Sequence, residues 1–420
     1  MLCRNADYGV TRGSRQMDHS GHLNRSPEFP VNELSTPDIT SHKHNIRVLL
    51  AAPSMNGRGG VSQYWRVLRP HLPEGIQYFA IGARSENGQS EMSALRVVRD
   101  SWRFACRLRR EDFDVVHLNP SVLPKALIRD GILLLLAKLF QKKVLVFAHG
   151  WNPAWDSGFP KYLRSIFPAV YGKADAFVVL GSGFKRRVRL LGYRKKVFVE
   201  SAPIPDEFLL DSGSEVAGRQ LPSGNVFNIL FLARVEKDKG IYEAIDTYRL
   251  LKQRHPFVTL TVAGDGSELT AARDYALRLG ANDILFVGHV EGTEKLSVFR
   301  SASAYLFPSY HEGLPLSVLE AMAFGLPIVT NNVGGLGDFF ENGVMGFMSS
   351  SREPEGLATL LTRLIADPEL CGKIRQFNRN YAAANFRPHK IALRMEEIYA
   401  SLFCMPDELS LSRDDNPSLA

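Results

Sequence analysis

The fold is decided by the stretch NIRVLLAAPSMNGRGGVSQYWRVLRPHL, residues 45–72 of this 420-residue chain. It begins with an apolar run of strand length (45–53), continues through a glycine-rich turn, and ends in a helical pattern that starts at Val61. Apolar strands that alternate with helices indicate βαβ units, whose parallel sheet is covered by helices on both faces. The stretch therefore predicts the first unit of a parallel α/β sheet.

The same order of strand and helix recurs along the chain and divides it into two domains. Further strands of the first half are predicted at 114–119, 143–150, 175–182 and 196–201. After a loop-like stretch interpreted as a linker (203–225), strands are predicted at 227–234, 257–266, 283–288, 303–309 and 326–331. The predicted fold class is α/β, with two Rossmann-like, doubly wound parallel-sheet domains that face each other across a cleft. The predicted boundaries are a disordered tail (1–44), a first domain (45–203), a second domain (204–386) and a flexible tail (405–420).

The composition is typical of a soluble globular protein, with 45% apolar and 23% charged residues. No apolar run reaches the roughly 18 residues that would span a bilayer, and the longest, ILLLLAKLF (132–140), is interpreted as a buried helix. The N-terminal sequence lacks the apolar core of a secretory signal. Four scattered cysteines without a CxxC pair argue against a zinc site or a disulfide framework, so a cytoplasmic location is expected.

The net charge of +7 is concentrated in two basic segments. The first is a helical stripe, because its arginines are spaced by three or four residues: Arg96, Arg99, Arg103, Arg107 and Arg110. The second lies between Gly181 and Val199 and includes Lys185, Arg186, Arg187 and Arg189. Each is either a solvated face or a binding site for an anionic membrane surface or a phosphate-bearing substrate. No nucleic-acid motif accompanies the charge, so nucleic acid is not expected as a partner.

Two loops of the first half carry candidate ligand-binding residues. The glycine-rich loop places Gly59 and Gly60 between a strand and a helix, where a backbone can approach an anion. His149 directly follows a predicted strand. It could bond to a substrate hydroxyl, transfer a proton, or simply be satisfied by its neighbours.

The second half places two cations at a strand end. Arg234 and Lys239 in ARVEKDKGI (233–241) suit a diphosphate, because an arginine can bind two oxygens and a lysine adds a point charge. Glu236 and Asp238 could instead pair with both cations in a solvated loop. Gly264 and Gly266 also end a strand, and either turn geometry or a passing nucleotide would explain them.

The stretch PSYHEGLPLSVLEAMAFG (308–325) places two carboxylates at the start of a helix. Pro315 suits the first helical position, so the free amides of Leu316 and Ser317 are expected to form an anion site. Glu312 lies in the loop before the helix and Glu320 on its second turn. They could contact a sugar and a ribose, act as a glycosidase pair, or be a capping carboxylate and a surface glutamate. Glycosidases need no phosphate-binding loops, and the loops described above therefore disfavour a glycosidase pair.

Together these loops resemble the glycosyltransferases of the GT-B fold, specifically retaining family 4 (glycosyl transferases group 1). The resemblance rests on R-x4-K-G, G-D-G and E-x7-E in the family's order, and covers about residues 46–404. It implies a nucleotide-diphosphate sugar donor, UDP- or GDP-linked, with no metal and no other cofactor. It also implies that a last helix (387–404) crosses back to the first domain.

By the same resemblance, Arg234 and Lys239 neutralise the diphosphate, Glu312 and His149 contact the donor sugar, and Glu320 holds the ribose. Further donor contacts are implied at Gly59, Gly60, Gly264, Gly266, Gly313, Leu316 and Ser317. Pro315 stands where many relatives have glycine, so the amide pattern can differ.

The expected function is a retaining, metal-independent hexosyltransferase that acts on a polysaccharide or lipid-linked acceptor in cell-surface or exopolysaccharide biosynthesis. The basic segments would hold it at the cytoplasmic face of a membrane. A nucleotide-sugar epimerase on the same fold and a catalytically silent sugar-binding scaffold are the alternatives.

Overall fold

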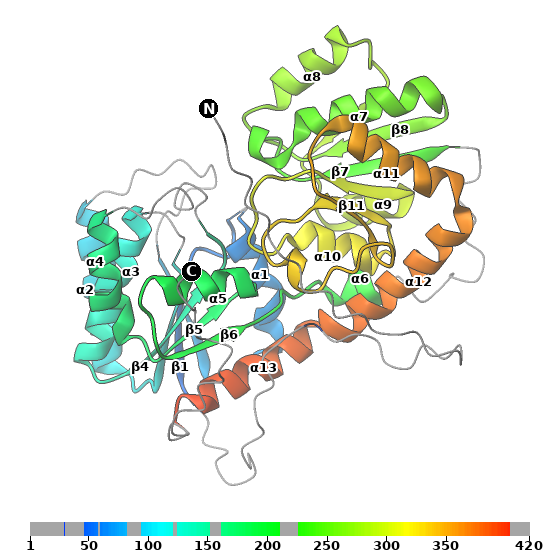
Figure 1. The fold of residues 1–420 in the computed structure, drawn as a ribbon. Coiled ribbons are helices and arrows are strands. Elements are labelled where there is room, and N and C mark those ends of the chain that lie inside the picture. Colours follow the sequence, from blue (N-terminus) through cyan, green and yellow to red (C-terminus); the bar gives the residue numbers. More distant parts are fainter. Residues whose placement is uncertain are drawn as a thin grey trace, which may run out of the picture.

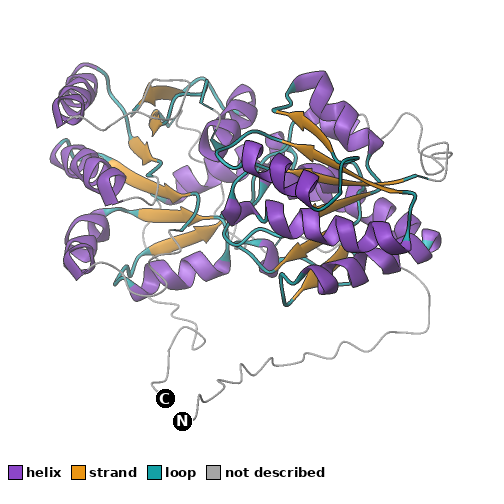
Figure 2. Ribbon diagram, turned by 90° about the horizontal axis from the view of Figure 1, so that it is seen from above, coloured by secondary structure: helices purple, strands orange, loops and turns teal. Residues whose placement is uncertain are grey.

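The computed structural model describes residues 29, 46–57, 59–81, 94–120, 124–151, 161–210 and 226–403. These residues form two domains, each with a parallel sheet between layers of helices (Figures 1 and 2). The α/β, two-domain fold class predicted from the sequence is confirmed. Within the described residues, no helix is both long and apolar enough to cross a membrane.

The first domain contains a sheet in the order β2-β1-β3-β4-β5-β6. Its strands are β1 (Val48–Ala52), β2 (Ile76–Ala80), β3 (Val115–Leu118), β4 (Lys143–Ala148), β5 (Ala176–Val179) and β6 (Lys196–Val199). Its helices are α1 (Gly60–Leu68), α2 (Ala94–Arg110), α3 (Pro124–Leu139), α4 (Lys161–Val170) and α5 (Ser182–Leu190). Every residue of β1, β3 and β5 is buried, as expected for a parallel sheet covered on both faces.

The second domain contains a sheet in the order β12-β11-β10-β7-β8-β9. Its strands are β7 (Phe227–Leu232), β8 (Val258–Ala263), β9 (Leu285–Gly288), β10 (Ala304–Phe307), β11 (Ile328–Asn331) and β12 (Gly346–Ser349). Its helices are α6 (Asp206–Leu210), α7 (Ile241–Arg254), α8 (Leu269–Arg278), α9 (Gly292–Ser301), α10 (Leu316–Ala323), α11 (Pro354–Ala366) and α12 (Pro368–Asn385). The loops that follow β7, β8 and β10 lie at one edge of this sheet, because the strands are parallel.

The last helix, α13 (Pro388–Ser401), returns to the first domain, and Figure 1 shows α12 and α13 running consecutively from one domain to the other. On α13, Arg394 bonds the buried carboxylate of Glu200 through Nε and Nη2, at distances from 2.6 to 3.0 Å. Tyr399 lies with its hydroxyl oxygen 2.7 Å from His117 Nδ1. These buried contacts fix α13 on the first domain.

The two domains also meet directly where two glycines of the second domain approach carbonyl groups of the first. A Cβ atom on Gly313 would lie 2.0 Å from the His149 carbonyl oxygen, and one on Gly335 would lie 2.0 Å from the Leu180 carbonyl oxygen. Next to these contacts, the hydroxyl of Ser182 donates to Asp338 Oδ1 at 2.6 Å. Glycine at 313 and 335 therefore permits a backbone approach that no other residue would allow.

Several elements differ from the sequence-based expectation. The edge strands β2 and β12 and the helices α4, α9 and α12 were not predicted. The linker begins with the helix α6, whose Phe208 packs on Phe324 with ring centroids 5.4 Å apart; residues 211–225 lie outside the described part. The apolar run of 132–140 is buried on one face only, because Leu139 is 76% exposed.

Within the expected N-terminal tail (1–44), Phe29 belongs to the described residues. Its ring is buried 5.2 Å from that of Phe339, and its amide donates to Asn385 Oδ1 at 2.8 Å. The prediction of a disordered tail is therefore wrong at this residue. The rest of the predicted tail and the predicted flexible end (405–420) lie outside the described residues.

Candidate functional site

A cavity of about 1000 Å³ lies between the two domains. It is lined by the loops after β1, β7, β8, β9 and β10, as expected for ligand sites at the carboxyl ends of parallel strands. The structure brings together most of the residues predicted from the sequence: Gly59, Gly60, Arg234, Lys239, Gly264, Gly266, Glu312, Leu316, Ser317 and Glu320. A cavity of this size is sufficient for a ligand as large as a nucleotide sugar.

The first charged pair of the cavity joins the loops after β7 and β10. Lys239 is 9% exposed, and its Nζ donates to Glu312 Oε1 at 2.8 Å and to the His311 carbonyl at 3.2 Å. The Ser309 hydroxyl donates to the same Glu312 oxygen at 2.9 Å. Within the described residues Glu312 Oε2 accepts no hydrogen bond, so this oxygen is available to a ligand.

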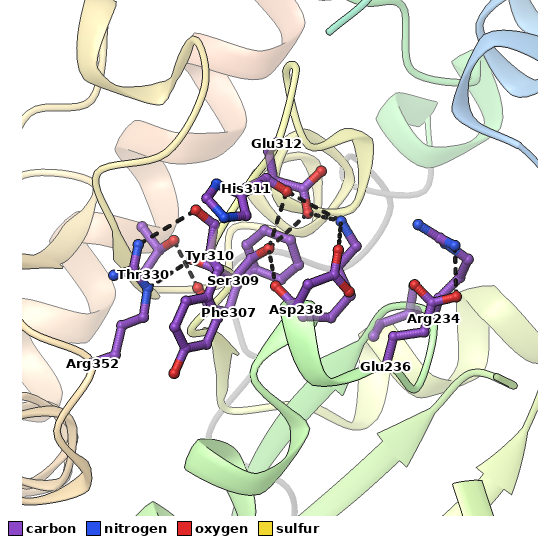
Figure 3. Close-up of polar contacts among 12 residues, drawn as sticks. Arg234, Glu236, Asp238, Phe307, Ser309, Tyr310, His311, Glu312, Thr330 and Arg352 are labelled. Carbon is purple, nitrogen blue, oxygen red and sulfur yellow. Dashed lines mark hydrogen bonds and ion pairs between the residues drawn. The ribbon is translucent and has the colours of Figure 1, made fainter. Parts of the chain in front are cut away.

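Arg234 lies beside this pair, lines the cavity and is exposed. Its Nη1 donates to Glu236 Oε1 at 2.6 Å, and Figure 3 shows these two side chains facing each other, apart from the group around Ser309 and Glu312. The sequence left open whether carboxylates pair with the two cations of this loop. In the structure both cations, Arg234 and Lys239, have such a partner. A phosphate would compete with Glu236 for the guanidinium, because both are oxyanions with similar spacing.

The start of α10 provides backbone donors and a second charged pair. The amides of Leu316 and Ser317 belong to the first helical turn, and neither donates a hydrogen bond to a described residue. On the second turn, Glu320 is buried, and its Oε1 accepts from Lys295 Nζ at 2.7 Å. Lys295 comes from α9 and also lies 5.6 Å from the centroid of the Phe208 ring. Free amides and a buried carboxylate are thus held at one helix end.

The glycine loop of the first domain faces the cavity with open backbone. Apart from the adjoining backbone, no atom of the described residues lies within 4 Å of the position that a Cβ would take on Gly59 or Gly60. Arg66 of α1 holds the loop from below, because its Nη2 donates to the carbonyls of Met55 and Gly57 at 2.6 and 3.0 Å. Packing therefore does not explain these two glycines, whereas a ligand close to the backbone would.

Gly264 and Gly266 have a different explanation. A Cβ on Gly264, whose φ is +146°, would lie 1.8 Å from the Ala233 carbonyl oxygen, and one on Gly266 would lie 2.4 Å from that of Val235. Both glycines are needed for close packing of the loop after β8 on the loop after β7. This favours the turn-geometry interpretation, although both residues also line the cavity.

His149 and Gly313 do not line the cavity but meet each other beside it. The His149 ring stacks on Phe147 with centroids 3.9 Å apart, and burial lowers the pKa of His149 to about 3. The ring is therefore neutral at physiological pH, which argues against a role as a proton donor.

Asn119 determines which nitrogen of His149 carries the proton. Asn119 Nδ2 donates to the Ala51 carbonyl at 3.2 Å, which leaves Oδ1 as the atom 2.8 Å from His149 Nε2. Trp65 Nε1 donates to the same oxygen at 3.0 Å. Because Oδ1 only accepts, His149 Nε2 carries the hydrogen and Nδ1 is an acceptor.

Sequence reasoning missed Lys295 and Asn119. Neither carries a recognisable local signal, since Lys295 meets Glu320 across 25 residues and Asn119 meets His149 across 30. The position of Asn119 at the end of β3 was the only available hint, because side chains at strand ends gather at one edge of a parallel sheet.

Comparisons with known proteins agree with this arrangement. Residues 218–381 match the family model described as Glycosyl transferases group 1. Glycogen synthase of Mycobacterium tuberculosis is 33% identical over 175 residues, which are 41% of this chain and 42% of that protein. The capsular polysaccharide biosynthesis glycosyltransferase CapM of Staphylococcus aureus is 27% identical over 46% of this chain and 51% of its own length. The chain thus spans about half or less of these two relatives.

Among solved structures, Anabaena Alr3699/HepE in complex with UDP and glucose superposes with a TM-score of 0.64 at 18% identity. The match covers 85% of this chain and all of that one. The resemblance predicted from the sequence is therefore confirmed for the fold: the chain has the GT-B arrangement, and residues 218–381 of its second domain match the glycosyl transferases group 1 model. The assignment to retaining family 4 stays a prediction.

Proposed function

We propose that this protein transfers a glycosyl group from a nucleoside-diphosphate sugar to an acceptor hydroxyl. The observation that carries the proposal is the second-domain wall of the cavity. Arg234, Lys239 and the free amides of α10 form an anion site there, and Glu312 and Glu320 lie on either side of it. An anion site between two carboxylates suits a ligand whose diphosphate lies between a sugar and a ribose.

Lys239 and Arg234 would act on the leaving group. As the bond between the anomeric carbon and the diphosphate oxygen breaks, negative charge develops on the phosphate, and fixed cations stabilise that charge. In the structure Lys239 is paired with Glu312 and Arg234 with Glu236. Diphosphate binding would draw Arg234 away from Glu236, while Lys239 is buried and already in position.

Glu312 and Glu320 would hold the two ends of the donor. Glu312 Oε2 would accept from a hydroxyl of the transferred sugar, since Oε1 is already used by Lys239 and Ser309. Glu320 would accept from the ribose hydroxyls through the oxygen that Lys295 leaves unused. The amides of Leu316 and Ser317 would donate to the phosphate or sugar.

We further propose that the transfer retains the anomeric configuration and that the sugar is a hexose. The acceptor hydroxyl would attack from the face on which the diphosphate leaves, and its proton would pass to the leaving phosphate oxygen. This route needs no protein nucleophile, and a neutral His149 is compatible with it. The similarity to CapM and glycogen synthase supports a saccharide acceptor in polysaccharide or glycolipid biosynthesis.

Nucleotide-induced stabilisation tests the donor site. A nucleoside diphosphate at a hundred times its Kd should stabilise the folded protein by about 2.7 kcal/mol, so thermal unfolding is measured with UDP, GDP and ADP. We expect a shift with one base that disappears in an Arg234→Ala, Lys239→Ala variant and persists in Lys237→Ala, an exposed lysine of the same turn. No shift with any nucleotide would contradict the proposal.

Acceptor dependence separates transfer from epimerisation. A transferase releases nucleoside diphosphate in step with the consumption of a saccharide acceptor, whereas an epimerase changes the sugar without an acceptor. Donor and product are therefore followed by NMR with and without acceptor. A silent scaffold would bind the nucleotide and convert neither.

A further inference from the structure

The outer face of α3 carries an apolar stripe that no part of the described chain covers. Ile128, Ile132, Leu135 and Leu139 recur at spacings of four, three and four residues, so they lie on one side of the helix. Their side chains are between 38% and 76% exposed. The opposite side of α3, including Leu133 and Leu134, is fully buried in the domain core.

The neighbouring helix α2 presents a similar outer face. Leu95 is 81% exposed, and Val98 and Trp102 are each 67% exposed, at successive helical turns. The two helices pack side by side on the same sheet, together with α4, which adds the exposed Ile166 (Figure 1). Large exposed apolar side chains are thus concentrated on one side of the first domain, and patches of this kind mark interaction surfaces.

The charge of this face is positive. α2 contains six arginines and one carboxylate, and α3 also contains one carboxylate. Both carboxylates are buried: Asp130 is bonded by the adjacent Arg129, and Asp100 lies 3.7 Å from Arg99 and 4.0 Å from Arg103. Arg109, Arg110 and Lys125 are exposed and form no ion pair with a described residue. The apolar stripes are therefore accompanied by cations and by no exposed acid on α2 or α3.

The structure also revises the basic segments predicted from the sequence. Arg107 of the stripe bonds Gln77 and Glu111 and so belongs partly to the domain. In the second segment, Arg187 lies over the Trp151 ring at 5.5 Å, and Arg189 donates to the Lys195 carbonyl at 2.6 Å. Exposed cations remain in both segments, with Arg110 at the end of α2 and Arg186 on α5.

We propose that the outer face of α2 and α3 docks on an anionic lipid bilayer. Interfacial helices combine apolar side chains that enter the headgroup region with arginine and lysine that contact anionic lipids. Trp102 lies between Arg99 and Arg103, and tryptophan favours the membrane–water interface. The absence of exposed carboxylates on α2 and α3 favours this occupant, because an anionic surface would repel them.

The position of the face connects it to the cavity. Helices of a parallel sheet begin at the carboxyl ends of the strands, so Leu95 and Lys125, at the starts of α2 and α3, lie toward the cleft side of the domain. A bilayer on this face would adjoin the acceptor side of the cleft. This placement would suit an acceptor that is linked to a lipid. The inference about the acceptor rests on the proposed function, whereas the docking of the face on a bilayer does not.

Vesicle binding tests the docking. The full-length protein is sedimented with vesicles of phosphatidylglycerol and phosphatidylcholine, and with phosphatidylcholine alone, in the absence of any donor. An apolar variant carries Leu95→Ser, Val98→Ser and Trp102→Ser. A charge variant carries Arg109→Gln, Arg110→Gln and Lys125→Gln, which spares the arginines that neutralise the buried Asp100. A control on the second domain, Leu277→Ser with Arg278→Gln, changes residues of the same types on α8.

We expect the wild type and the control to bind the anionic vesicles and not the neutral ones. The charge variant should lose about a hundredfold in partition coefficient, because each cation near an anionic surface contributes roughly fivefold. The apolar variant should lose binding as well, with an unchanged melting temperature since its sites are exposed. Wild type that stays in the supernatant, or variants that bind as the wild type does, would overturn the proposal. A concentration-dependent dimer that the apolar variant abolishes, without vesicle binding, would instead make this face an interface between copies.

Discussion

The two walls of the cavity differ in how they are built. The second-domain wall contains two lysine–glutamate pairs at 2.8 and 2.7 Å, each with one buried member, and each pair joins two different elements of the domain. The first-domain wall contains the backbone of the glycine loop, with open space around Gly59 and Gly60, and the α1 side chains Gln63 and Arg66, of which Arg66 bonds the loop carbonyls. Fixed charges select a ligand of matching charge, whereas an open backbone admits ligands of various shapes. We therefore expect substitutions in the second-domain wall to have the larger effects on donor binding and chemistry.

The largest effect is expected from the two cations. Arg234→Ala with Lys239→Ala should lower the transfer rate by at least about 10²–10³-fold, because it removes the charges that stabilise the leaving diphosphate. The rate is measured with saturating donor, and Lys237→Ala is the matched control. If the double variant kept a rate near that of the wild type, the two cations would not stabilise the leaving diphosphate, and the expected difference between the two walls would not hold.

Glu312→Gln should separate chemistry from binding. The amide keeps the shape of the side chain but weakens acceptance from a sugar hydroxyl, so we expect a loss of about 100-fold in rate with nucleotide affinity unchanged. Transfer and nucleoside-diphosphate binding are measured side by side, with Glu294→Gln on the surface of α9 as control. An equal loss of transfer rate and of nucleotide affinity would indicate that Glu312 contacts the nucleotide and not the sugar.

Glu320→Gln tests the ribose contact. Hydrogen bonds to a charged group contribute about 1.5–3 kcal/mol, so we expect nucleotide affinity to fall by about tenfold or more. Calorimetric titration with the nucleoside diphosphate and with its 2′-deoxy form gives the specific readout. The wild type should prefer the ribose form and the variant should not. A preference that survives the substitution would assign Glu320 a structural role with Lys295.

The first domain should respond to pH through His149, which lies beside the cavity. Burial lowers the pKa of His149 to about 3 from an ordinary value of 6.5, so the unfolded chain binds this proton more tightly than the folded one. Acidification through the range between about 6.5 and 3 therefore favours unfolding, and stability above that range is unaffected. His117 is shifted in the same direction by burial.

Melting temperatures of the wild type and His149→Gln, measured between about pH 7 and pH 5, check this expectation. The decrease on acidification should be smaller in the variant, while His389→Gln on the exposed side of α13 should behave as the wild type. An identical decrease in His149→Gln would show that the ring is not held neutral by the fold.

The smallest expected effect is an increase in the affinity for the nucleoside diphosphate. Glu236 competes with phosphate for Arg234, and this exposed ion pair contributes only about 0.2–1 kcal/mol. Glu236→Gln should therefore tighten nucleoside-diphosphate binding by up to about fivefold. Titration at low and high salt measures it, since added salt should reduce the difference. Weaker binding would indicate that Glu236 positions Arg234 for the ligand.

The sequence predicted the central strands and one edge strand of each sheet, β6 and β9, but missed the other two edge strands, β2 and β12. The runs that form β1, β3 and β5 are buried at every position and are therefore continuously apolar. The edge strand β2 is only partly buried, and its sequence IQYFA lacks that signal. The helix α12 has polar residues over much of its length, so its amphipathic pattern is weak. A continuous apolar run is therefore the clearest local signal of a strand that is buried on both faces.

The candidate site also contains residues that the sequence identified and residues that it did not. Strand-end position and residue type identified Arg234, Lys239, Glu312 and Glu320, because ligands of parallel sheets bind at that edge. The partners of these residues were not identifiable: Lys295 for Glu320 and Asn119 for His149 are contacts across different strands and helices. Likewise, ILLLLAKLF indicated a buried helix, and only packing against the sheet shows which of its faces remains exposed.

The sequence by itself therefore determined the two α/β domains, their order and the chemistry of the loops that follow the strands. These features depend on local periodicity and on residue type. The tertiary structure alone decided which charges pair, which glycines face open space rather than a neighbouring carbonyl, and which apolar residues of α2 and α3 stay exposed. Those features depend on contacts between segments far apart in the chain, which a linear pattern does not encode.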